Sequence, residues 1–132
     1  MNDLPSMIKL VALALVVASL PLSWWWLRQR GASTRTRLAA LTVVTTFLTF
    51  DLIVFGAFTR LTDSGLGCPD WPGCYGQASP LAARADIHAA EQVLPDGPVT
   101  WAKAWIEMIH RYLAMTVGVL IMVAAAVGWR IR

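Results

Sequence analysis

The chain has 132 residues, of which 57% are hydrophobic and only 14% are charged, and its formal net charge is +3. This composition is too apolar for an ordinary soluble domain. Its clustered basic residues indicate membrane topology rather than a nucleic-acid surface. The sequence contains neither a glycine loop for phosphate nor a Ser-His-Asp arrangement.

Three apolar blocks are long enough to cross a bilayer, which takes about 20 residues in a helix. They cover residues 7–27, 38–58 and 105–129. Open strands leave backbone groups without partners in lipid, so all three blocks are predicted helices. The predicted fold class is therefore an all-α polytopic membrane bundle, forming one domain with a long loop at 59–104.

The first block is predicted to be an anchor or packing helix. Lys9 precedes the apolar run, which also resembles a signal peptide. However, no small-x-small cleavage site precedes Arg28, and the run ends in Trp24, Trp25 and Trp26. We therefore expect this helix to be retained.

Clustered arginines predict the orientation by the positive-inside rule. The link between the first two blocks contains no acidic residue, whereas the loop at 59–104 is rich in acids. The link and the C-terminal end are predicted to be cytoplasmic, and the loop and the N-terminus to lie outside. The arginines concerned are Arg28, Arg30, Arg35 and Arg37 in the link, and Arg130 and Arg132 at the end.

The second block contains several threonines and one acid. Threonine hydroxyls can bond back to their own helix. Asp51 lies inside the block, so we expect it to be neutral or paired, either in a hydrogen bond between helices or in a proton relay. Gly56 and Ala57 would let another helix or a flat ligand approach closely.

The loop holds the only two cysteines, Cys68 and Cys74, separated by five residues that include Pro69, Pro72 and Gly73. On the predicted oxidising side a disulfide is favoured, and two reduced thiols are the alternative. The loop offers no second cysteine pair for a metal.

Arg60 at the outer edge of the second block suits a carboxylate ligand, or it is an interface anchor. Residues 80–94 predict a short helix at the membrane surface. Its His88 and Glu91 are most simply a solvated face.

The third block begins with Glu107 and His110, whose spacing places them on one helical face. Ionisable side chains in a span commonly mark a site. Ala114, Gly118 and Ala125 fall within about a quarter-turn of His110. A haem bound by the imidazole against this small-residue strip is one interpretation, and close helix packing is the other. Glu107 alone could be a favourable charge at a helix N-terminus.

Three motifs around the loop, in this order, resemble the haem A synthase family, and the likeness covers roughly residues 40–130. The first block resembles an extra N-terminal span of some bacterial members. The motifs are residues 56–66 (GAFTRLTDSGL), the loop with Cys68 and Cys74, and Glu107-x-x-His110-Arg111.

The resemblance implies an inner-membrane oxidoreductase that converts the C8 methyl group of haem O to a formyl group, which gives haem A for cytochrome oxidase. Family members have two similar four-helix halves, each with a haem site held by paired histidines. The resemblance makes His110 an axial ligand of a haem b iron, Glu107 the catalytic acid, and Cys68–Cys74 a disulfide. We further expect Arg60 and Arg111 to meet the haem propionates.

The chain departs from the family because it stops at Arg132 after three spans. The second axial histidine is not in it. We therefore expect the N-terminal portion of the enzyme, inactive alone. Expected partners are haem O, haem O synthase and the bilayer, but no nucleic acid; the electron acceptor and homo-oligomer formation stay open. Alternatives are a b-type haem electron carrier, which would not need Glu107, and an oxidase assembly subunit, which would not need His110.

Overall fold

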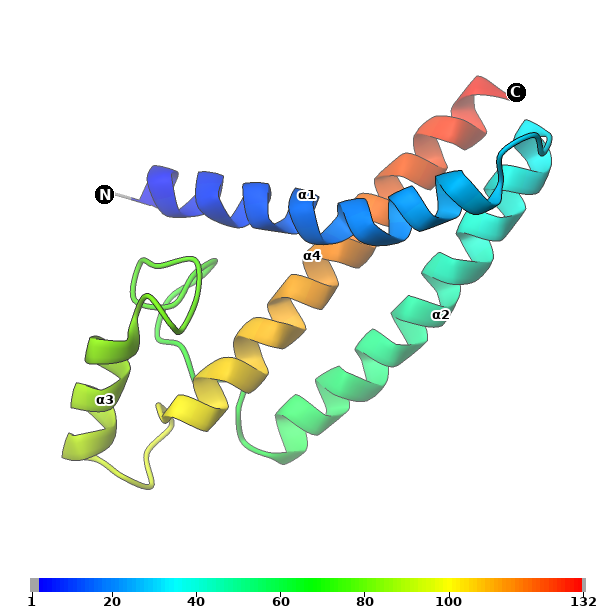
Figure 1. Ribbon diagram of the computed structural model, residues 1–132. Helices are drawn as coiled ribbons and strands as arrows, with labels where there is room; N and C mark the ends of the chain where they lie inside the picture. The colour runs from blue at the N-terminus through cyan, green and yellow to red at the C-terminus, as the bar shows by residue number, and fades with distance from the viewer. Residues whose placement is uncertain (1–2, 132) are drawn as a thin grey trace.

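The computed structural model describes residues 3–131, with side chains from Met7 to Ile131. Within these residues the chain forms four helices and no strand (Figure 1). The predicted all-α class is therefore confirmed. Arg132, which was expected to add to the basic end, lies outside the described residues. The helices are α1 (Asp3–Arg28), α2 (Thr34–Leu61), α3 (Arg84–Val93) and α4 (Trp101–Arg130).

Three helices, α1, α2 and α4, are long and apolar enough to cross a membrane. Each extends a few residues beyond its predicted apolar block, because capping groups and polar residues continue a helix past the apolar stretch. Ser33 caps α2 by accepting a hydrogen bond from the Thr36 amide, and Thr100 caps α4 by accepting one from the Lys103 amide. The expected threonine back-bonds are present at Thr45 and elsewhere along α2.

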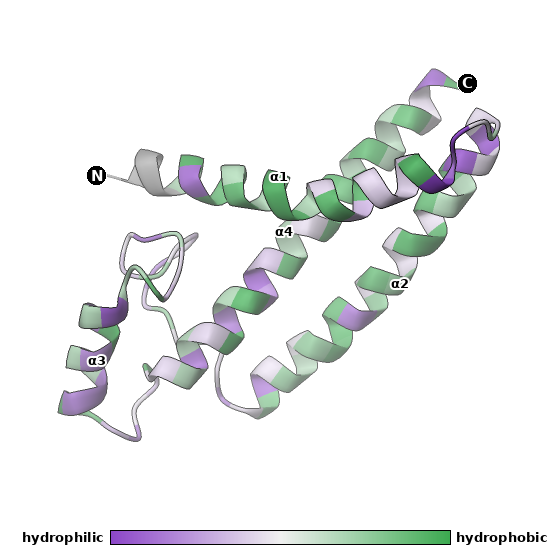
Figure 2. Ribbon diagram, viewed as in Figure 1, coloured by the Kyte–Doolittle hydropathy of each residue, from purple (hydrophilic) through white to green (hydrophobic). Residues whose placement is uncertain are grey.

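The helix α4 is the central element, because it packs against each of the other three. α2 runs beside α4 in the opposite direction, and α1 crosses α4 at a steep angle (Figure 1). Most of the apolar surface of the long helices remains exposed and faces outward (Figure 2). Such a surface suits lipid or further helices rather than water.

The long loop and α3 gather at one end of α2 and α4, opposite the α1–α2 link and the end of α4 (Figure 1). Leu10 of α1 is buried in a cluster with Cys68, Cys74, Ile87 and Met108. The N-terminal half of α1 and the loop therefore lie at the same end of the molecule. This is expected where two spanning helices, α1 and α2, separate the start of α1 from the loop. Which end faces the cytoplasm stays a prediction.

The basic link at the other end is folded onto tryptophans. The Trp25 indole donates a hydrogen bond of 2.8 Å to the Arg37 carbonyl, and the Arg37 guanidinium lies 4.9 Å from the Trp26 ring centroid. This arrangement fixes how α1 turns into α2 and holds α1 across the bundle.

Candidate functional site

His110 lies at the contact between α4 and α2. Its ring stacks on Phe55 with the ring centroids 6.3 Å apart and the planes inclined by 14°. Its Nε2 faces Gly56, where an added Cβ would stand 2.9 Å from that nitrogen. No described residue gives the imidazole a hydrogen bond. The ring therefore fits only because α2 has no side chain at position 56.

Next to His110 a cavity of about 380 Å³ opens at the loop end of α2 and α4. It brings together the four side chains that the sequence singled out, although they come from separate parts of the chain. The guanidinium of Arg60 makes no hydrogen bond or ion pair among the described residues. The lining residues are Gly56, Thr59, Arg60, Asp63, Gly65, Leu66, Glu107, His110 and Arg111.

Glu107 is buried at the wall of this cavity, with an exposed fraction of 7%. One carboxylate oxygen accepts a hydrogen bond of 2.7 Å from the Cys68 amide, and the other accepts one from the Arg111 guanidinium. A buried carboxylate needs such donors because burial removes its water. Glu107 is thus held from two directions, which is more than a charge placed at a helix N-terminus.

Arg111 points into the loop. Its Nη1 donates to the carbonyl oxygens of Asp70 at 2.9 Å and Gly73 at 2.5 Å, with Pro72 also within reach. Sequence reasoning expected a haem propionate as its partner and missed these carbonyls. The i, i+4 spacing from Glu107 was a signal for the ion pair that the structure contains.

The structure joins Cys68 and Cys74 in the predicted disulfide, with their Cα atoms 4.9 Å apart. Directly after it, Tyr75 and Gly76 turn the chain with positive φ angles of 50° and 69°. The Asp70 carboxylate accepts hydrogen bonds from both of their amides. Sequence reasoning counted Asp70 only as one acid among several and missed this role.

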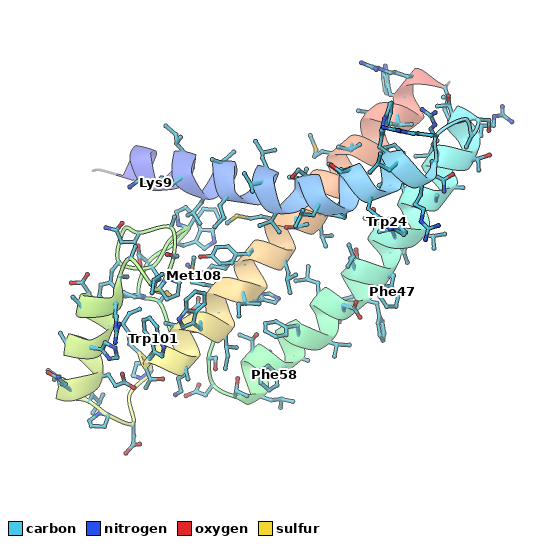
Figure 3. The ribbon with its side chains drawn as sticks, in the orientation of Figure 1. Lys9, Trp24, Phe47, Phe58, Trp101 and Met108 are labelled. Carbon is cyan, nitrogen blue, oxygen red and sulfur yellow. A yellow bond between two sulfur atoms is a disulfide. The ribbon has the colours of Figure 1, made fainter. Side chains whose placement is uncertain are left out.

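Side chains from α4 hold the rest of the loop (Figure 3). Met108 is fully buried between α4 and the loop, and the Tyr112 hydroxyl donates to the Ala78 carbonyl. Trp101, at the start of α4, stacks on His88 of α3 with 5.4 Å between ring centroids. His88 also contacts Glu91 at 3.3 Å. This pair lines no part of the cavity.

The small-residue strip of α4 does not form one slot beneath His110. Ala125 lines a groove between α4 and α2, whereas Gly118 lines another between α4 and α1. The prediction of a single strip is corrected here because α1 and α2 press on adjacent sides of α4 and divide that sector between them. Asp51 is exposed on α2 and makes no side-chain hydrogen bond to another described residue, so the expected hydrogen bond between helices is not present among them. A role in a proton relay stays a prediction.

The residues around the cavity fit one side of a haem. The His110 imidazole makes no hydrogen bond, its ring occupies the space that Gly56 leaves, and the Arg60 guanidinium is without a hydrogen bond or ion pair among the described residues. Within the described residues no group of three or more His, Cys, Asp and Glu could hold a bare metal ion. A lone imidazole beside a guanidinium is a set of groups that a haem, with its iron and its propionates, would use.

Comparison with known proteins gives a consistent result. The profile of the COX15-CtaA family, described as a cytochrome oxidase assembly protein, matches residues 39–132. A "Heme A synthase" of Shewanella oneidensis is 46% identical over 87 residues, which cover 66% of this chain and 26% of that protein. A "Heme A synthase" of Sinorhizobium medicae is 33% identical over 107 residues, which cover 71% of this chain and 29% of that protein.

The chain thus spans less than a third of the length of these relatives. No solved structure matches it. The matched segment contains most of α2, the disulfide loop and α4, and so includes every residue that lines the cavity, while the whole of α1 precedes it. With three helices able to cross a membrane, the chain is a multi-pass membrane protein, and it belongs to the COX15-CtaA cytochrome oxidase assembly family.

Proposed function

We propose that this chain is the N-terminal part of a haem A synthase, which oxidises the C8 methyl group of haem O to a formyl group. The observation that carries the proposal is the cavity where His110, Glu107 and Arg60 meet. The relatives named "Heme A synthase" support it. The oxidation of haem O follows from the resemblance of the motifs to the haem A synthase family, and the use of the product in cytochrome oxidase also agrees with the description of the matching family.

His110 is the residue that would hold the iron of a haem b in this half of the enzyme, and a histidine outside this chain would complete the pair. A bound haem supplies the redox chemistry. Arg60 would pair with a propionate, since a guanidinium matches a carboxylate with two parallel hydrogen bonds. Arg111 was expected to do the same; its Nη1 and Nη2 donate to the loop carbonyls and to Glu107, which makes Arg60 the better candidate for a propionate partner.

Glu107 is the candidate catalytic acid. Its two oxygens are fixed by the Cys68 amide and by Arg111, so its negative charge has a set position at the cavity wall. A fixed negative charge stabilises positive charge that develops on a neighbouring carbon, and a carboxylate can also take a proton from it. Either action would favour removal of electrons from the methyl group.

The same proposal places the chain in a bacterial inner membrane, with the disulfide loop and the N-terminus in the periplasm. Arginines of the link and a disulfide at the opposite end of the bundle support this orientation. Haem O synthase would supply the substrate. The second histidine is missing from this chain, so we expect activity only from the complete natural protein.

The proposal is tested by extracting haem from membranes of cells that make the complete natural protein and separating haem O from haem A by chromatography. We expect haem A from the wild type, loss or strong change of the haem spectrum in His110→Ala, and haem without conversion in Glu107→Gln. The matched controls are His88→Ala and Glu91→Gln, which lie outside the cavity.

The alternatives give different patterns. A b-type electron carrier would bind haem without converting haem O, and Glu107→Gln would leave it unchanged. An assembly subunit would contain no haem and would be indifferent to His110→Ala. Either pattern would contradict the proposal.

A further inference from the structure

Two neighbouring side chains of α4 hold opposite parts of the disulfide loop. Glu107 accepts from the amide of Cys68, where the ring begins. Arg111 donates to the carbonyls of Asp70 and Gly73, farther along the same ring. Glu107 and Arg111 also bind each other, one helical turn apart. The loop and the two side chains therefore form a closed circuit of hydrogen bonds.

Burial makes this circuit interdependent. The side chains of Arg111 and Glu107 are only 13% and 9% exposed, so water does not readily replace a lost partner. The loop segment they hold contains the disulfide, whose two cysteines are also buried. Movement of the loop would remove one donor from Glu107, and loss of Arg111 would remove the other.

The donors of Arg111 are directed to the loop and to Glu107, whereas the guanidinium of Arg60 in the same cavity is without a described partner. The two arginines of the cavity thus differ in kind. Arg60 has all of its donors available to a ligand, whereas Nη1 and Nη2 of Arg111 are already bonded to the loop and to Glu107.

We propose that Arg111 is a positioning residue, which fixes the direction of the Glu107 carboxylate by tying it to the Cys68–Cys74 loop. This tie consists of the hydrogen bonds from Arg111 to Glu107 and to the loop carbonyls, all within this chain. Its effect on oxidation rests on the proposed function, because it acts through Glu107.

The tie is tested first on the disulfide, without any haem chemistry. The rate at which dithiothreitol opens Cys68–Cys74 is followed by maleimide labelling of the released thiols in detergent. Arg111→Gln should raise this rate by about ten-fold or more, as expected for the loss of charge-assisted hydrogen bonds. Arg111→Lys should raise the reduction rate less, because a lysine ammonium keeps the positive charge but cannot reach several acceptors in the geometry of a guanidinium. The control Arg84→Gln, on α3, should leave it unchanged.

The effect on Glu107 is then tested in the complete natural protein. Arg111→Gln should lower conversion of haem O by about ten-fold while the haem content and spectrum, which report His110, stay normal. Its effect on conversion should be smaller in a Cys68→Ser/Cys74→Ser background, because residues acting through one unit are not additive.

Unchanged reduction rates in both Arg111→Gln and Arg111→Lys would overturn the tie. Normal conversion in a variant with a faster reduction rate would overturn the positioning of Glu107. Absence of haem A from the wild type would instead refute the proposed function, while the reduction rates would still decide the tie. Loss of haem from Arg111→Gln would also overturn the proposal, because it would indicate that Arg111 binds a haem propionate.

Discussion

Gly56 of α2 lies directly against the Nε2 edge of the His110 ring on α4. A backbone position without a side chain is thus matched to the one imidazole that faces the cavity. The fit depends on the α2–α4 contact and on the stacking of the same ring on Phe55.

We expect Gly56→Ala to displace the imidazole, because the new Cβ would stand 2.9 Å from Nε2. Haem content of the purified complete protein should fall several-fold, and the absorption spectrum of the remaining haem should change. The matched control is Gly118→Ala, where a Cβ would meet nothing within 4 Å. Equal haem content in Gly56→Ala and wild type would show that the ring is not confined by α2.

Arg60→Gln should weaken haem binding without disturbing the fold, since this guanidinium makes no hydrogen bond or ion pair among the described residues. Loss of one charge-assisted pair with a propionate would lower affinity by about ten-fold or more. Titration of haem into the apoprotein, followed by absorbance, measures the change. Arg84→Gln on α3 removes the same charge away from the cavity, and an equal loss in both variants would point to general electrostatics.

Gly67→Ala should destabilise the loop end of the molecule. A Cβ there would lie 2.5 Å from the backbone carbonyl of Lys103, and backbone cannot move aside as a flexible side chain does. Overpacking of this kind costs about 1–3 kcal/mol of unfolding free energy. Thermal unfolding in detergent gives the value, and Gly65→Ala, where nothing lies within 4 Å, should leave it close to that of the wild type.

Asp70→Ala should loosen the turn after the disulfide. The carboxylate holds the amides of Tyr75 and Gly76, and the first of these residues has the positive φ that a non-glycine residue adopts at a cost. We expect a loss of about 1 kcal/mol and faster amide exchange at these two positions. Hydrogen exchange detects the change, and Asp96→Ala, at an exposed position outside this turn, serves as the comparison.

The helices were predictable because lipid leaves a long apolar block few alternatives to a helix. The Glu107–His110 spacing likewise predicted that both side chains reach one region. The partners of these side chains were harder to predict from the sequence. Arg111 binds backbone carbonyls, which carry no residue identity in a sequence, and the contact between Gly56 and His110 depends on how two distant helices pack.

The small-residue strip of α4 is a second feature that the sequence alone could not predict. Helical periodicity placed Gly118 and Ala125 on one side of α4, and both residues do lie on that side. The boundary between the α1 and α2 contacts passes through that sector, and this boundary is set by the crossing of α1. Helical periodicity describes one helix at a time and holds no information about such a boundary.

The burial of Leu10 has a consequence for biogenesis. This residue belongs to α1, yet its neighbours include Cys68, Ile87 and Met108, which are synthesised after it. The N-terminal half of α1 therefore lacks these neighbours until α4 has been inserted and the loop has closed. Assembly of this end is non-local and follows synthesis of the whole segment, so an early insertion intermediate would leave α1 free to tilt in the bilayer.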